Sequence, residues 1–207
     1  SVCAIKGNFD DAQSAVKQIF TDQALREKMN ANEKIFSSAN SINWGRLVPQ
    51  IVYYIAAYAQ LIADHVIQPG DAVNICVPTG NFGNILAAFY AKKMGVPVNR
   101  FICASNQNHV LTDFIRTGTY DKNRVFHATI SPSMDILISS NLERLLFDLY
   151  EEDDASVRAL YDALARDGKF TVSEGVKKKL QTLFWGDYCD DDATQAEKDF
   201  YENIYQR

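Results

Sequence analysis

Residues 77–84, VPTGNFGN, place two glycines and two asparagines directly between two apolar runs. The run before them, VNICV, is typical of a buried strand, and the run after them, ILAAFYAKKMG, is typical of an amphipathic helix that ends at a glycine. A strand-to-helix turn directs backbone N–H groups and the positive end of the helix at one point, and glycine lets an anion approach the backbone. The stretch therefore predicts a phosphate-binding turn, while a bare G-x-x-G is equally compatible with a tight turn and nothing more.

The same stretch lacks the features of the common nucleotide motifs. No Gly-Lys-Ser/Thr follows the glycines, which excludes a P-loop. The third glycine and the downstream acidic residue of a dinucleotide fingerprint are also missing.

A second polar cluster, SSANSINWGR, ends at Arg46 and precedes a long helical pattern. Pro49 is tolerated only in the first turn of a helix, so we expect this helix to begin at residues 45–48. Ser41 and Arg46 would then lie at the helix N-terminus, where a hydroxyl, amides and a guanidinium can bind a phosphate. The alternative is ordinary capping by Asn40 or Ser41, with Arg46 at the surface.

Periodicity predicts the elements that position these clusters. Apolar, strand-like runs alternate with helical patterns, an order that predicts an α/β fold with a parallel sheet and crossover helices. The strand-like runs are at 2–6, 72–77 and 100–104, and the helical patterns are near 10–20, 47–64, 83–94 and 107–116.

From residue 139 onward we expect helices only. Three start signals of the Ser/Thr-x-x-Glu type mark this part: Ser140 with Glu143, Thr171 with Glu174, and Thr194 with Glu197. The acidic clusters EEDD and DDD are interpreted as solvated helix starts and loops. The predicted organisation is an α/β core at 1–138 and a helical C-terminal extension at 139–207.

Composition narrows the class of protein. The chain has 207 residues, 47% of them hydrophobic, and no apolar stretch approaches the roughly 18 residues of a membrane span. A net charge of −5 without a basic stripe argues against nucleic acid as a partner. The spacing of the cysteines suggests neither a metal site nor a disulfide framework, and three of them lie in apolar runs that predict burial: the four are Cys3, Cys76, Cys103 and Cys189. We expect a cytoplasmic protein in which the three histidines have structural or surface roles.

Four motifs in order, GNFDDAQ, SANSINWGR, PTGNFGN and SPSMDI...SSNLERLLF, resemble threonine synthase over essentially the whole chain. This family consists of pyridoxal-phosphate enzymes of the tryptophan-synthase β-like fold (fold type II). The resemblance implies a lyase that acts on a phosphorylated substrate, converting O-phosphohomoserine and water into threonine and phosphate. It implies that the backbone of Gly80, Asn81, Phe82, Gly83 and Asn84 binds the cofactor phosphate. It also implies that Ser41, Arg46 and the Asn81 side chain bind the substrate phosphate.

Two family segments are missing from this sequence. The lysine that carries the cofactor lies in a Phe-Lys-Asp context before a Ser-Gly-Asp-Thr-Gly motif, and the family closes with a Thr-Ala-His segment. We therefore expect a fragment with no catalytic residue of its own, inactive alone and prone to self-association through unpaired strands. The alternatives are a serine or threonine dehydratase of the same fold and a non-catalytic phosphate-binding module. For Met134 and Asp135, packing and shaping of the site both remain open.

Overall fold

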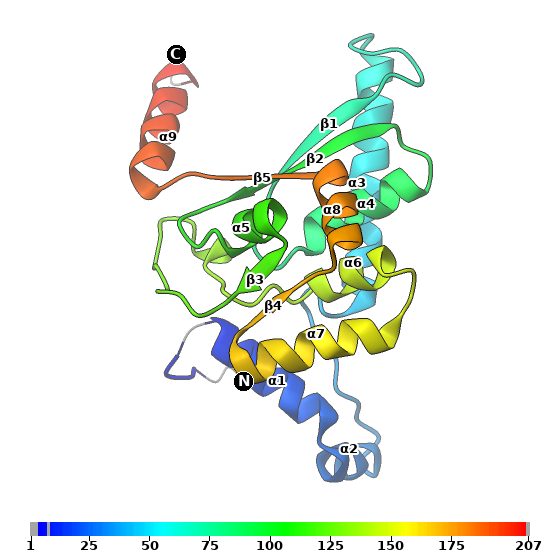
Figure 1. Cartoon of the computed structure of the whole chain (residues 1–207), viewed down its shortest axis with the longest axis vertical. Helices are drawn as coiled ribbons and strands as arrows, with labels where there is room; N and C mark the ends of the chain where they lie inside the picture. Colours follow the sequence, from blue (N-terminus) through cyan, green and yellow to red (C-terminus); the bar gives the residue numbers. More distant parts are fainter. Residues whose placement is uncertain (1–3, 8, 206–207) are drawn as a thin grey trace.

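The computed structural model describes residues 4–7 and 9–205 (Figure 1). At its centre is a three-stranded parallel sheet in the order β1-β2-β5, built from β1 (Val73–Pro78), β2 (Val98–Ser105) and β5 (Phe184–Tyr188). The short strands β3 (Thr119–Asp121) and β4 (Lys169–Thr171) pair antiparallel in a second sheet. The prediction of an α/β fold with a parallel sheet is confirmed.

Helices occupy most of the remaining described chain. They are α1 (Phe9–Thr21), α2 (Gln23–Asn30), α3 (Trp44–Ala63), α4 (Gly83–Lys93), α5 (Val110–Thr117), α6 (Leu142–Leu149), α7 (Asp154–Asp167), α8 (Glu174–Leu183) and α9 (Asp191–Tyr205), with a single 3-10 turn at Pro132–Met134. The helices predicted near 10–20, 47–64, 83–94 and 107–116 correspond to α1, α3, α4 and α5, whereas α2 was not predicted. Figure 1 shows α9 extending away from the sheet beyond the end of β5.

One face of the parallel sheet is covered by helices. Along β2, Phe101, Cys103 and Ser105 are buried, whereas Arg100 and Ile102 are partly exposed. The helices α4, α5 and α8 pack against this sheet. The alternation of buried and partly exposed residues along β2 shows that these three helices cover the sheet face to which Phe101 and Cys103 belong.

Aromatic rings fill the space between the sheet and α4. The rings of Phe101 and Phe184, which are register partners on β2 and β5, lie 5.1 Å apart, and Phe82 lies 5.7 Å from Phe184. Phe89 of α4 completes the cluster at 6.4 Å from both Phe101 and Phe184. This cluster links the turn that contains Phe82 to the strands.

The expectation of helices only after residue 139 is wrong in two places. Residues 169–171 and 184–188 form β4 and β5, and β5 pairs with β2 of the first part. Phe184 is 2% exposed because it belongs to the central core. Strands this short have too few residues to show a clear alternation of apolar and polar side chains, so they were not predicted from the sequence. The boundary between residues 138 and 139 stays a prediction.

The three predicted helix-start signals are also wrong. The N-cap residue of α6 is Asn141, that of α8 is Ser173, and the carboxylate of Asp190 accepts from the Ala193 N–H at the start of α9. The hydroxyls of Ser140 and Thr171 have other partners, Asn81 Oδ1 and Thr119 Oγ1. The acidic clusters do lie at helix starts, since Asp153 caps α7 and its hydrogen bonds with Ser156 lower the pKa of its carboxyl.

Two further predictions concern the N-terminal run and the cysteines. Of the strand-like run at 2–6, residues 2 and 3 lie outside the described residues and residues 4–6 form no strand. Of the cysteines in apolar runs, Cys103 is buried as predicted, Cys76 is exposed, and Cys3 lies outside the described residues; Cys189, which is in no apolar run, is exposed. Among the residues described, no helix is long and apolar enough to cross a membrane, and no group of acidic residues, histidines and cysteines is arranged to hold a metal ion.

Candidate functional site

The glycine-rich stretch forms a turn from the C-terminal end of β1 into the N-terminus of α4. Two side chains hold this turn closed. The Thr79 hydroxyl lies 3.0 Å from the Val77 carbonyl and 3.1 Å from Asn84 Oδ1. The Asn84 amide donates to the Pro78 carbonyl at 2.7 Å and accepts from the Ile85 N–H at 2.9 Å. The turn is therefore a fixed structure rather than a loose connection.

Phe82 anchors the turn in the core. It is the N-cap residue of α4, its φ angle of 65° lies in the left-handed region, and its side chain is 1% exposed. A non-glycine residue in this conformation costs roughly 1 kcal/mol or more. Burial of the phenyl ring against Phe184 offsets that cost and holds the backbone in the conformation that the turn requires.

The turn presents a run of backbone donors. In the part of the chain that the structure describes, the N–H groups of residues 80–84 have no protein acceptor. Gly80, Phe82 and Gly83 are nevertheless buried, and an unpaired buried N–H is costly unless a ligand or water accepts from it. Together with the positive end of α4, these donors fit an anion with several oxygens, such as a phosphate monoester.

Ser41 packs directly against this turn. A Cβ atom added to Gly83 would lie 2.7 Å from Ser41 Cβ and 2.8 Å from Ser41 Oγ, distances that real Cβ atoms do not show. Gly83 is thus required for close approach of two segments far apart in sequence. The structure brings Ser41 and the turn together.

Asn141 links Ser41 to the turn. Its side-chain Nδ2 donates to Ser41 Oγ at 2.9 Å and to the Asn81 carbonyl at 3.0 Å, and its backbone N–H donates to the same carbonyl at 3.1 Å. Asn141 is completely buried. One side chain therefore fixes the relative position of both predicted phosphate-binding segments.

Arg144, one turn further along α6, supports the same junction. Its guanidinium donates to the carbonyls of Ser41 at 3.0 Å and Ile42 at 2.8 Å, and to Asn141 Oδ1. Because these hydrogen bonds go to the backbone of Ser41 and Ile42 and to Asn141, Arg144 holds the segment before α3 in position.

Two serines hold the other side of the turn. The Ser139 hydroxyl donates to the Gly80 carbonyl at 3.0 Å, and the Ser140 hydroxyl donates to Asn81 Oδ1 at 3.2 Å. With Oδ1 engaged, the Asn81 side chain directs its NH₂ group elsewhere, and no protein acceptor for that group is found within the described ranges. Asn81 keeps two donors available for a ligand.

Tyr120 fixes the backbone at Ser139 through its hydroxyl. Its hydroxyl donates to the Leu137 carbonyl at 2.9 Å and accepts from the Ser139 N–H at 2.8 Å. Burial raises the pKa of the Tyr120 phenol, so the group stays protonated and keeps both hydrogen bonds at neutral pH.

Arg46 lies apart from this arrangement. The helix α3 begins at Trp44, one residue before the predicted range, with the Asn43 side chain accepting from the Gly45 N–H. Arg46 is in the first turn, is exposed, and its guanidinium has no partner among the residues described. Pro49 is the sixth residue of the helix rather than a first-turn residue. The structure therefore does not bring Arg46 into contact with the glycine turn.

The segment SPSMDI has a packing role that the sequence left open. A Cβ on Gly80 would lie 3.2 Å from Met134 Cα, so this segment covers the turn closely. Asp135 is buried, and its carboxylate accepts from the side chains of Asn106 (2.7 Å), Asn108 (3.0 Å) and Thr129 (2.7 Å). Met134 and Asp135 thus help to shape the site by fixing the backbone that lies over Gly80.

The residues that sequence reasoning missed as site residues are Ser139, Asn141 and Arg144. All three lie in the motif SSNLERLLF, which carried part of the family resemblance. The available signal was that two consecutive serines and an asparagine precede a helix, yet no spacing rule connects them to segments 60 or 100 residues away.

Comparison with known proteins identifies relatives that match most of the chain. No protein-family model matches the chain. The human protein "Threonine synthase-like 1" is 49% identical over 187 residues, which cover 89% of this chain and 25% of that protein. The threonine synthase of Pseudomonas aeruginosa is 44% identical over 181 residues, which cover 87% of this chain and 36% of that protein.

A solved structure shows the same fold. The pyridoxal-phosphate-bound threonine synthase from Brucella melitensis superimposes with a TM-score of 0.75 at 42% identity, over 90% of this chain and 38% of that one. The chain thus spans between a quarter and two-fifths of the length of these relatives.

Proposed function

We propose that this chain, which is homologous to the threonine synthases and shares their fold, forms the cofactor-phosphate side of a threonine synthase-type active site. The observation that carries the proposal is the run of N–H groups at residues 80–84, at the N-terminus of α4, which have no acceptor in the described chain although Gly80, Phe82 and Gly83 are buried. The cofactor is pyridoxal 5'-phosphate, whose phosphate monoester matches these donors in charge and in the number of acceptor oxygens.

The chain's own residues bind and orient. The backbone N–H groups of Gly80, Asn81, Phe82, Gly83 and Asn84 hold the cofactor phosphate. Thr79 and Asn84 keep the turn closed, and Ser139 and Ser140 bond to the Gly80 carbonyl and the Asn81 amide oxygen, which fixes the backbone that carries these donors. Pyridoxal phosphate, when bound, supplies the electron sink for the chemistry of the amino-acid substrate.

We propose a second phosphate site next to the first, to which Arg46 belongs although it does not contact the glycine turn. Asn141 bonds to the Ser41 hydroxyl and to the Asn81 backbone carbonyl, which holds these two residues next to each other. The Asn81 NH₂ group and the exposed Arg46 guanidinium have no acceptor among the described residues and are available for phosphate oxygens. We assign these three groups to the phosphate of O-phosphohomoserine. A serine or threonine dehydratase of the same fold has no use for such a second site, which favours the threonine synthase reaction over that alternative.

The whole-protein activity proposed is the conversion of O-phospho-L-homoserine and water to L-threonine and phosphate, by a pyridoxal-phosphate-dependent lyase in the cytoplasm. No catalytic residue is assigned within this chain. The described lysines with a bond or ion pair have partners outside the glycine turn: Lys92 bonds to the Val98 carbonyl, Lys93 pairs with Asp148, Lys177 with Glu174, Lys179 with Glu151 and Lys198 with Glu202. The isolated chain is therefore proposed to bind cofactor without catalysing the reaction.

Equilibrium dialysis with pyridoxal phosphate and with pyridoxal tests the cofactor site. Saturable binding of pyridoxal phosphate, displaced by inorganic phosphate and absent with pyridoxal, would support the proposal. Equal binding of both compounds would contradict it, because random imine formation at surface lysines does not require the phosphate. Borohydride reduction and peptide mapping of the same samples should reveal no single lysine labelled stoichiometrically.

Arg46→Ala separates the two phosphate sites. The change should leave pyridoxal-phosphate binding unaltered and weaken binding of O-phosphohomoserine roughly tenfold or more, as expected for a lost charge-assisted contact. If Arg46→Ala instead releases the cofactor, the assignment of the two sites is reversed. If it changes neither, the non-catalytic phosphate-binding alternative gains support.

A further inference from the structure

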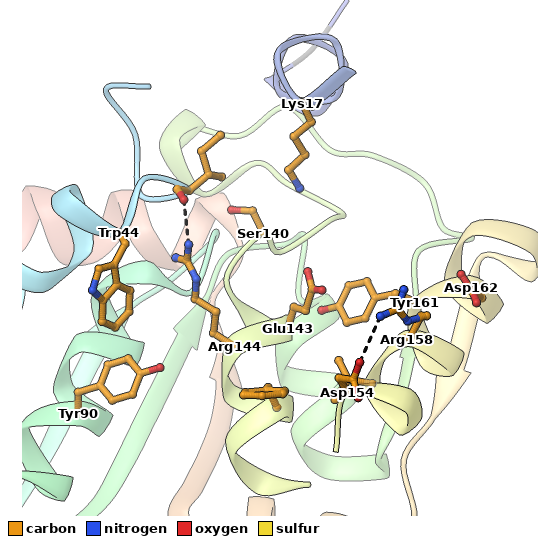
Figure 2. Close-up of a pocket in the computed structure, with 13 residues that line it drawn as sticks. Lys17, Trp44, Tyr90, Ser140, Glu143, Arg144, Asp154, Arg158, Tyr161 and Asp162 are labelled. Atoms are coloured by element: carbon orange, nitrogen blue, oxygen red, sulfur yellow. Dashed lines mark hydrogen bonds and ion pairs between the residues drawn. The ribbon is translucent and has the colours of Figure 1, made fainter. Parts of the chain in front are cut away.

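A cavity of about 760 Å³ lies between α1, α3, α4, α6 and α7, outside the glycine turn (Figure 2). None of residues 79–84 lines it. Its volume is within the range of about 300–1,000 Å³ that is typical of small-molecule sites.

Two opposite charges face each other across this cavity. Figure 2 shows Lys17 reaching from α1 toward the Glu143 carboxylate, which projects from α6. The two groups do not form an ion pair with each other or with any other residue in the described part of the chain. By contrast, Arg158 at the rim is paired with Asp154 at 3.2 Å.

Aromatic side chains form one wall of the cavity. The rings of Trp44 and Tyr90 meet edge to face with centroids 5.5 Å apart, and the Arg144 guanidinium lies 5.6 Å from the Trp44 ring. Because Arg144 is also bonded to the carbonyls of Ser41 and Ile42, the wall is held in place before any ligand binds. Phe147 adds a further apolar surface and is 39% exposed.

Tyr161 lies beside the Glu143 carboxylate on the opposite side of the cavity (Figure 2). Burial raises the pKa of the Tyr161 phenol, and the nearby charge of Glu143 contributes in the same direction. Tyr161 therefore presents a neutral hydroxyl to the cavity, and Glu143 remains the group that can balance a ligand cation.

We propose that this cavity binds a free α-amino acid with a large apolar side chain, as a site separate from the cofactor turn. The carboxylate of the ligand pairs with Lys17, its ammonium group pairs with Glu143, and its side chain packs on the Trp44–Tyr90 wall. A zwitterion offers partners to two opposite charges that form no ion pair among the described residues, and an aromatic wall favours an apolar side chain. The inference does not depend on the proposed cofactor site.

Tryptophan fluorescence of a Trp185→Phe variant measures this binding directly. Trp44 is then the only tryptophan, because the chain contains two, and Trp185 is 54% exposed on β5, so its replacement is mild. The probe is L-phenylalanine, with phenethylamine and 3-phenylpropionate as analogues that lack the carboxylate or the ammonium group. We expect saturable quenching or enhancement with L-phenylalanine and at least tenfold weaker binding of both analogues.

Two variants and two matched controls complete the test. Lys17→Met and Glu143→Gln, both at exposed positions, should each weaken L-phenylalanine binding at least tenfold while leaving the circular dichroism spectrum unchanged. Lys28→Met on α2 and Glu197→Gln on α9 remove equally exposed charges and should have no effect. Equal binding of the three compounds, or no loss in either cavity variant, would overturn the proposal. Displacement of L-phenylalanine by inorganic phosphate would also overturn it, because it would place the ligand at the glycine turn.

Discussion

The side-chain amide of Asn141 donates to the hydroxyl of Ser41 at 2.9 Å, across a sequence separation of 100 residues. The same amide nitrogen bonds to the Asn81 carbonyl at 3.0 Å. Through this one residue, the segment before α3 and the turn before α4 form a single rigid unit. The proposed cofactor and substrate phosphate sites are therefore predicted to respond together to changes at Asn141.

Asn141→Ala should lower the free energy of unfolding by about 1–3 kcal/mol, because it leaves the Ser41 hydroxyl and one N–H of Arg144 without their buried partner. Urea denaturation followed by circular dichroism measures the change. Asn99→Ala is the matched control, since Asn99 is an exposed residue with one amide contact to Asn74, and it should change stability by less than about 0.5 kcal/mol. Equal effects of the two changes would contradict the role assigned to Asn141.

Gly83→Ala should destabilise the protein by about 1–3 kcal/mol, although alanine favours helices, because the added methyl would lie 2.7 Å from Ser41 Cβ. Pyridoxal-phosphate binding should weaken in the same variant, since the backbone must shift to relieve the clash. Gly175→Ala in α8 meets no atom within 4 Å and should leave stability unchanged or raise it by up to about 1 kcal/mol. A neutral Gly83→Ala would show that the Ser41 segment moves away without cost.

Stability should fall at alkaline pH through Cys103. Burial raises the pKa of the Cys103 thiol from 9.0 to about 12. The folded state therefore holds this proton more tightly than the unfolded state, and the stabilisation is complete below pH 9 and lost as the pH rises toward about 12. In the Cys103→Ala variant, the free energy of unfolding should fall less steeply with pH in this window, by up to about 1.4 kcal/mol per pH unit. Urea midpoints measured from pH 8 to about 11 check this. Cys189→Ala, which removes a thiol that is already exposed, should not alter the slope.

The chain should self-associate through α3. Trp44, Val48, Val52 and Ile55 form a stripe at helical spacing along this helix, and their side chains are 48%, 39%, 60% and 38% exposed. An apolar stripe of this length favours contact with a second apolar surface. Light scattering after size exclusion should show dimers or larger species, and Val52→Glu should shift them toward monomer. Val125→Glu, at a residue that is 72% exposed but outside the stripe, should leave the distribution unchanged.

Local chemistry was enough to predict the glycine-rich turn between β1 and α4, whereas its binding of a phosphate stays a prediction. A strand followed by Pro78, Gly80 and Gly83 and then by an amphipathic helix is specified within about 20 residues, and the structure places these elements as expected. The same holds for the parallel sheet, because alternating strands and helices leave few other arrangements. Family motifs read from the sequence agree with the relatives found by comparison.

Tertiary packing decided the features that no local hydrophobic periodicity predicts. The strand β5 joins the sheet beside β2 although helices surround it in sequence, because Phe184 and Gly186 fit against the core and against Thr112 of α5. Asn141 and Arg144 became site residues only because α6 packs between two distant segments. The exposure of Cys76 follows from its position on the sheet face opposite the helices. Sequence determines which groups are available and what local structure they form, whereas side-chain packing between distant elements determines which of them meet.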